Sequence, residues 1–192
     1  MGSRALRWST LLVGLMLVAA CGSGGHSASP TATPTAAGSS SVGAGRSPGV
    51  APATGRQIGT DLMTYRLPTH GGWVFDEGGR SAEYFADGGL WSVHVGGAYV
   101  AENGLAGQAR SALHATAGDW PNGTTRMLAD RVVDGRAGYV IVSQGPEPEG
   151  YVYLWGTVVG HQWTYLTFQT PKKNDAATKW IESILASVHW KR

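Results

Sequence analysis

The sequence predicts an α+β fold, with an antiparallel β-sheet flanked by helices, in one domain that follows a long low-complexity segment. Two observations predict this class. Runs of alternating or uniformly apolar residues, separated by turns rich in Gly and Asp, are typical of strands joined by hairpins. Two other segments carry apolar residues at helical spacing, one before and one after the last group of strands.

The first half of the domain is expected to contain short strands. Residues 62–67 alternate, with Met63, Tyr65 and Leu67 on one face, and the strand ends at Pro68. Three further extended segments are expected at residues 73–75, 82–86 and 90–95. A helix is expected over residues 103–118, with Asn103 as its N-cap, from the spacing of Leu105, Ala109, Ala112, Leu113 and Thr116.

The second half is expected to hold four antiparallel strands, at residues 124–133, 137–143, 151–159 and 162–169. Asp134-Gly135 is a strong hairpin signal between the first two. The middle two strands are apolar on both faces, which indicates central positions in the sheet. The strand at 162–169 is expected to be the last.

A second helix is predicted to close the domain. Its cap is either Thr170, ahead of Pro171, or Asn174 or Asp175. Its apolar stripe consists of Ala177, Trp180, Ile181, Ile184, Leu185 and Val188. Trp180 should be its largest anchor on the sheet, whereas the polar residues Lys172, Lys173, Lys179 and Glu182 are expected to face away.

Residues 1–20 read as an export signal. Arg4 and Arg7 precede Leu11–Ala20, an apolar run of ten residues that is too short to span a bilayer. Cys21, the only cysteine, then follows Val-Ala-Ala, and this motif resembles the bacterial lipobox. We expect cleavage before Cys21 and lipid (palmitate-type) attachment there. The alternative is an ordinary signal peptidase that cuts after Ala20.

Residues 21–57 are predicted to be a lipidated cysteine followed by a flexible linker, and residues 58–192 a single domain. The linker is rich in Gly, Ser, Thr and Pro and contains no aromatic residue, so it buries too little apolar surface to fold. As a random coil it would span about 30–36 Å. Whether its Thr/Pro-rich stretch is O-glycosylated or a bare spacer remains open.

The charge balance argues against nucleic acid as a partner. The chain has 15 Lys and Arg against 13 Asp and Glu, and removal of Arg4 and Arg7 leaves 13 of each. A near-neutral protein without a basic block has no electrostatic footprint for nucleic acid. We therefore expect membrane contact through the lipid, at the extracytoplasmic face of the cell membrane, with reach into the cell wall or to the surface.

Three local features resemble a known superfamily. They are Tyr65-Arg66-Leu67-Pro68-Thr69-His70-Gly71-Gly72-Trp73, the hairpin Asp134-Gly135-Arg136-Ala137-Gly138-Tyr139, and the end from Trp163-Thr164-Tyr165-Leu166-Thr167-Phe168 through the closing helix to Val188. Together they resemble the PsbP-like α/β/α sandwich superfamily, and within it the LpqN-type lipoproteins of mycobacteria and other actinobacteria. The resemblance implies a binding or adaptor module with no shared enzyme activity, so it transfers no catalytic residue.

Searches of the sequence for catalytic and metal-binding patterns find none. The six histidines show no zinc spacing, and Glu147 and Glu149 flank a proline in a predicted polar loop. We expect no catalytic residue, no metal and no cofactor. The candidates for a binding surface are Trp120, in a loop, and Trp190, near the end, which rank above the other tryptophans for exposure. The preferred alternative is ordinary packing beneath a loop.

Three functions are compatible with these observations. The preferred one is a membrane-anchored envelope lipoprotein whose domain is a non-catalytic module that binds a protein or another envelope component. The first alternative is a carrier of a lipid or another apolar envelope molecule, suggested by the aromatic content. The second is an enzyme whose site is assembled from distant residues such as His94, His161 and a carboxylate.

Overall fold

The computed structural model describes residues 49–70, 72–86, 88–99, 103–146 and 150–191. The chain divides into two compact units, and the second, Ser41–Arg192, contains every element described below. The export signal, Cys21 and most of the linker lie outside the described residues, as do Glu147 and Glu149. No helix within the described ranges is both long and apolar enough to cross a bilayer.

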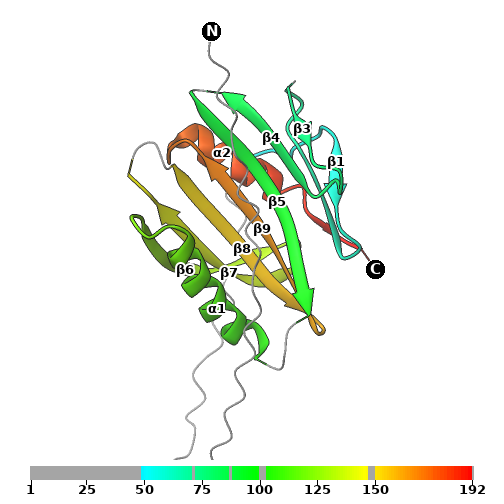
Figure 1. The fold of residues 1–192 in the computed structure, drawn as a ribbon. Coiled ribbons are helices and arrows are strands. Elements are labelled where there is room, and N and C mark those ends of the chain that lie inside the picture. Colours follow the sequence, from blue (N-terminus) through cyan, green and yellow to red (C-terminus); the bar gives the residue numbers. More distant parts are fainter. Residues whose placement is uncertain (1–48, 71, 87, 100–102, 147–149, 192) are drawn as a thin grey trace, which may run out of the picture. The chain divides into compact units, whose positions relative to one another are not determined.

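A seven-stranded antiparallel sheet forms the centre of the domain, with strand order β3-β4-β5-β9-β8-β7-β6 (Figure 1). Its strands are β3 (Val74–Phe75), β4 (Ser81–Ala86), β5 (Gly89–Tyr99), β6 (Thr124–Val133), β7 (Arg136–Gln144), β8 (Tyr151–Val159) and β9 (Gln162–Thr170). A smaller sheet, in the order β1-β2-β10, contains β1 (Gln57–Gly59), β2 (Met63–Arg66) and β10 (His189–Trp190).

Helices cover both faces of the large sheet, which confirms the predicted α+β class. Helix α1 (Gly104–Asp119) packs Ala109 and Ala112 against one face, over β6, β7 and β8. Helix α2 (Asp175–Leu185) and the small sheet cover the opposite face, where most of the core lies. In the view of Figure 1, α1 lies in front of the sheet and α2 behind it.

The predicted strands and their inward faces are confirmed. Met63, Tyr65 and Leu67 are fully buried, as expected from the alternation in β2. Asp134 and Gly135 form the predicted hairpin turn between β6 and β7, with φ values of 44° and 80°. Positive φ at both central residues gives the turn the twist that antiparallel strands need.

The structure corrects the predicted ends of the domain. β9 is not the last strand, because β10 follows α2 and pairs with β2. β1 was not predicted, and ordered contacts begin ahead of residue 58: Ala53 is buried, and its N–H donates to the Ser183 carbonyl at 2.9 Å. Strands of two or three residues are too short to show a periodicity of their own, so only their partners reveal them.

The caps of the two helices differ. Among the alternatives for α2, the N-cap is Asn174, whose side chain accepts a hydrogen bond from the Ala177 N–H at 2.8 Å. Asn103 stands at the N-cap position of α1, as predicted, but its side chain makes no capping hydrogen bond. The predicted stripe of α2 is buried, and Val188 is buried beyond the end of the helix.

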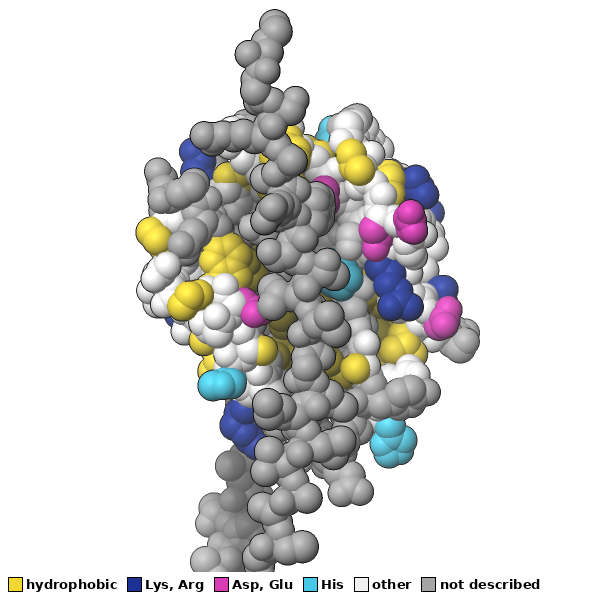
Figure 2. Space-filling view, viewed as in Figure 1, with side chains coloured by type: hydrophobic (Ala, Val, Ile, Leu, Met, Phe, Trp, Pro, Cys, Tyr) yellow, Lys and Arg dark blue, Asp and Glu magenta, His cyan; other side chains and the backbone are white. Residues whose placement is uncertain are grey.

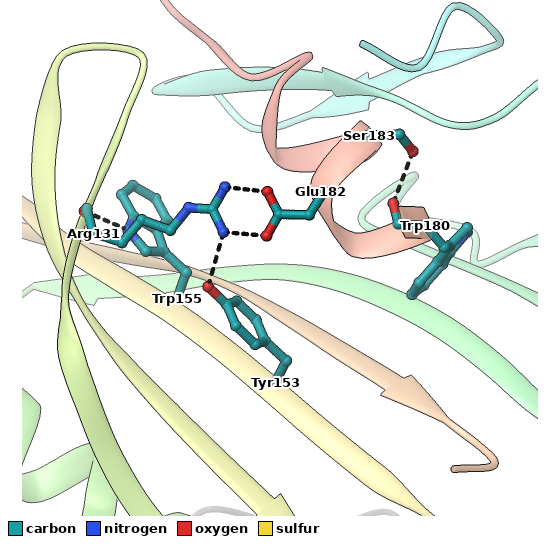
Figure 3. Close-up of polar contacts among 6 residues, drawn as sticks. All are labelled: Arg131, Tyr153, Trp155, Trp180, Glu182 and Ser183. Carbon is teal, nitrogen blue, oxygen red and sulfur yellow. Dashed lines mark hydrogen bonds and ion pairs between the residues drawn. The ribbon is translucent and has the colours of Figure 1, made fainter. Parts of the chain in front are cut away.

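Glu182 does not face away from the domain. It forms a bidentate ion pair with Arg131 of β6, at 2.5 and 2.6 Å, and Arg131 also donates to the Tyr153 hydroxyl at 3.4 Å (Figure 3). Burial by itself would lower the pKa of Arg131, but the hydrogen bonds and charge of Glu182 outweigh it and raise that pKa. The Arg131 guanidinium therefore stays charged where it faces α2.

Trp180 is the aromatic anchor of α2, as predicted. It is 7% exposed, and its ring lies 5.4 Å from that of Trp91 and 5.6 Å from that of Phe168, edge to face in both cases. The Trp73 ring is stacked with the Trp180 ring, with the centroids 6.3 Å apart. The tryptophans of this layer therefore pack on one another.

The face of the domain drawn in Figure 2 carries mixed charge. Figure 2 shows acidic and basic side chains next to each other, with no extended patch of one sign among the residues that are not grey. This distribution agrees with the near-neutral charge expected from the sequence.

Removing one member of the buried ion pair should destabilise the domain. In Glu182→Gln the Arg131 guanidinium keeps its charge without a counterion, so the free energy of unfolding should fall by about 3–5 kcal/mol in urea denaturation. The double variant Arg131→Met/Glu182→Met should recover most of this loss, because neither charge is then buried. Lys179→Gln, on the exposed face of α2, is the control. A single variant as stable as the wild type would contradict the interpretation.

Candidate functional site

Helix α1 covers only part of its face of the large sheet. It packs on β6, β7 and β8, whereas no helix of the described residues packs on the same face of β4 and β5. The register places Ser81, Ser92, His94, Tyr165 and Thr167 on this part of the face. All five are partly exposed. We call this set the open face.

A serine and a histidine face each other on the open face. Ser81 is the first residue of β4 and pairs with His94 of β5, and the Ser81 Oγ lies 2.6 Å from the His94 Nδ1. Burial lowers the pKa of His94, the nearby Arg80 lowers it further, and Asp76 opposes the shift. The imidazole is therefore neutral at neutral pH and free to accept or donate one hydrogen bond.

Aromatic side chains of β9 and β7 lie on the same face of the sheet as the Ser81–His94 pair. The Tyr165 ring lies flat over Gly96, where an added Cβ would approach it to 2.3 Å. The Trp163 ring lies 4.5 Å from it, and the Trp163 Nε1 donates to the Tyr139 hydroxyl at 2.7 Å. Burial raises the pKa of Tyr165 and of Tyr139, so both phenols stay protonated. These contacts hold the rings in fixed positions.

A pocket adjoins the open face where β4 begins. β4 pairs with β5 only as far as His94, so β5 has no neighbour on that side from Gly97 onward among the described residues. The gap holds about 260 Å³. Its lining consists of Thr60, Asp61, Leu62, Arg80, Gly96, Gly97, Ala98, Gln162, Trp163 and Thr164. We call this the β5-edge pocket.

The two tryptophans proposed as exposed binding residues are half-buried. Trp190 lies in β10, where its Nε1 donates to the Val133 carbonyl at 3.3 Å and Arg136 lies 4.8 Å above its ring. Trp120 ends α1, with its N–H bonded to the Thr116 carbonyl at 3.2 Å. Both are therefore partly exposed and also packed at the end of an element, and their role in binding stays a prediction.

The histidines named for an assembled enzyme site do not meet. His94 pairs with Thr167, whereas His161 precedes Gln162 at the other end of β9, six residues or about 20 Å away along the chain. The described residues contain no group of three His, Cys, Asp or Glu that could hold a metal ion.

Sequence reasoning missed the β5-edge pocket. Two adjacent glycines inside a strand, Gly96-Gly97, were the available signal, because glycine in a strand often marks a close approach of backbone or ligand. The serine partner of His94 had no signal, since thirteen positions separate the two residues in the chain.

Comparison with known proteins identifies the fold. No family model matches the chain, and no curated protein matches it. The solution structure of cyanobacterial PsbP (CyanoP) from Synechocystis sp. PCC 6803 matches at 12% identity and a TM-score of 0.52, covering 74% of this chain and 96% of that one. The domain therefore has a PsbP-like fold.

A second match is a crystal structure from Bacteroides thetaiotaomicron VPI-5482, at 16% identity and a TM-score of 0.42. It covers 72% of this chain, and the match spans about half (49%) of that one. At these identities the likeness concerns the fold alone, and function must be argued from the site.

The lowered pKa of His94 predicts a pH-dependent stability. As pH falls below the ordinary value of 6.5, the unfolded chain binds a proton before the folded chain does. The contribution of His94 to the free energy of unfolding is therefore fully present above about pH 6.5, and it is lost as the pH falls through the lowered pKa. Between pH 7.5 and pH 5, the free energy of unfolding measured by urea denaturation should fall more for the wild type than for His94→Asn. His114→Asn, which retains His94, should behave as the wild type; equal losses in all three would contradict the assignment.

Proposed function

We propose that this chain is a lipoprotein of the bacterial cell envelope, anchored at Cys21 to the extracytoplasmic face of the membrane. Its PsbP-like domain acts as a non-catalytic binding module, as the resemblance to the LpqN-type lipoproteins of actinobacteria implies. The lipobox at Val18–Cys21 and the aromatic-free linker support the anchor. The partner is a protein or another envelope component, and the near-neutral charge disfavours nucleic acid.

The β5-edge pocket beside the open face is the observation that supports a binding role. It combines an uncovered strand edge, one acidic and one basic residue, and the apolar walls of Leu62 and Trp163. Convergent polar groups around a concave surface with apolar walls are typical of binding sites. The neighbouring rings and the Ser81–His94 pair are held by contacts, so the site is formed without a ligand.

The alternatives have less support. The Ser81–His94 contact favours a serine-dependent hydrolase as a second candidate, but the nearby Asp76 carboxylate accepts the backbone N–H groups of Arg80 and Ser81 and so holds the turn. Covalent labelling of Ser81 by a fluorophosphonate would favour the hydrolase. The aromatic content suggested an apolar carrier, but Trp73, Trp91 and Phe168 pack on Trp180 in the core.

The anchor predicts a change of location for Cys21→Ala. A chain without the thiol cannot receive a diacylglyceryl group, and the linker offers no other apolar attachment. In a bacterial host that processes lipoproteins, the wild type should fractionate with membranes and the variant should not. A neighbouring replacement, Ser23→Ala, is the control. Membrane association of Cys21→Ala at the wild-type level would contradict the anchor.

The binding role predicts a position-specific adduct in cells. A photo-crosslinking amino acid in place of Asp61, on the wall of the β5-edge pocket, should capture a discrete partner upon irradiation. The same amino acid in place of Arg110, exposed on α1, should not. The adduct should disappear when the pocket is altered by Arg80→Gln. Identical adducts from both positions, or none from either, would contradict a binding role for this pocket.

A further inference from the structure

We propose that the β5-edge pocket binds the free carboxyl-terminal segment of an extended polypeptide, which adds to β5 as a strand in line with β4. This rests on the proposed binding function, because it names the chemistry of the partner for the same pocket.

The backbone of β5 presents to the pocket hydrogen-bonding groups that have no strand partner among the described residues. The Val95 N–H donates to the Arg80 carbonyl at 2.9 Å, so the peptide groups of Val95 point to the β4 side of β5. In an antiparallel pair, successive residues alternate in the side to which their N–H and C=O groups point. The groups of Gly97 therefore also point to the β4 side, where β4 has not yet begun and the pocket lies.

Gly96 and Gly97 hold β5 close against β9 and place no side chain beside the edge that borders the pocket. A Cβ on Gly97 would lie 2.5 Å from the Trp163 carbonyl oxygen, and one on Gly96 would meet the Tyr165 ring, so the packing of β9 requires glycine at both positions. A bare strand edge is the surface on which extended peptides add as strands, through main-chain hydrogen bonds.

The direction of the added strand brings its carboxyl end to Arg80. A segment that continues the line of β4 runs antiparallel to β5, as β4 does, so its residue numbers increase toward Ser81. The turn between β3 and β4, which ends at Arg80, occupies the line beyond. The segment must therefore end there, which brings its terminal carboxylate next to Arg80, a basic residue of the pocket lining that can pair with it.

The remaining walls define the end of the ligand. Leu62 and Trp163 suit an apolar terminal side chain, whereas Asp61 disfavours acidic residues upstream. The volume of about 260 Å³ lies below the ~300–1,000 Å³ typical of pockets for drug-sized ligands. It suits the last few residues of a chain.

The test uses the purified intact chain in mild detergent, labelled with ¹⁵N, and two forms of one probe. The probe is acetyl-Thr-Val-Thr-Val-Leu, either with a free carboxylate or amidated. The free acid should shift the amide resonance of Gly97 in a saturable manner, and the amidated form should bind at least about tenfold more weakly, because the charge-assisted contact is lost. In Arg80→Gln the affinity for the free acid should fall to that for the amidated peptide. Arg110→Gln should leave both affinities unchanged.

Equal binding of the two forms to the wild type would overturn the proposal, and this comparison does not depend on any variant folding. No shift at Gly97 with millimolar peptide would overturn it as well. If the crosslinker at Asp61 still captures a partner in that case, the binding module stands and the peptide ligand fails. If neither result is obtained, the proposed function itself fails.

Discussion

The buried ion pair between Arg131 and Glu182 joins α2 to the sheet, and the layer around α2 depends on where that helix lies. The side chains of Arg131 and Glu182 are only 15% and 12% exposed. A shift of α2 would separate the two buried charges and leave each without a counterion, so the helix tolerates little displacement. Other contacts follow from this placement: the Ser183 carbonyl accepts the Ala53 N–H, and the Ser187 hydroxyl accepts the Arg66 N–H at 2.8 Å. β10 then continues directly from α2 into the small sheet.

On the sheet itself, glycines lie opposite aromatic rings and leave room for them to pack against the backbone. Gly156 lies under the Tyr139 ring, and Gly138 lies against the Trp155 ring on the other face; a Cβ would approach these rings to 2.5 and 2.7 Å. Large rings can thus lie flat on the strands and pack closely against the backbone. The same arrangement of Gly96 and Tyr165 continues into the open face, so the candidate site shares its construction with the core.

The pocket itself arises from unequal strand lengths. β5 has eleven residues and β4 has six, so part of the β5 edge has no neighbour in the large sheet among the described residues. Exposed strand edges are a liability for association, and proteins usually keep them short or cover them. Here Thr60, Asp61 and Leu62 form the opposite wall of a gap of about 260 Å³ and leave the edge itself open.

The sequence alone determined the features that follow from local patterns. Alternation identified the inward face of β2, Asp134-Gly135 identified a hairpin, and the stripe around Trp180 identified α2, because these signals act over a few residues. Only the tertiary structure decided which residues meet across elements. Glu182 looked solvent-facing on its helix until α2 was placed against Arg131, 51 positions away. The β5-edge pocket likewise depends on where β4 begins relative to β5, which is a matter of strand register and not of either segment by itself.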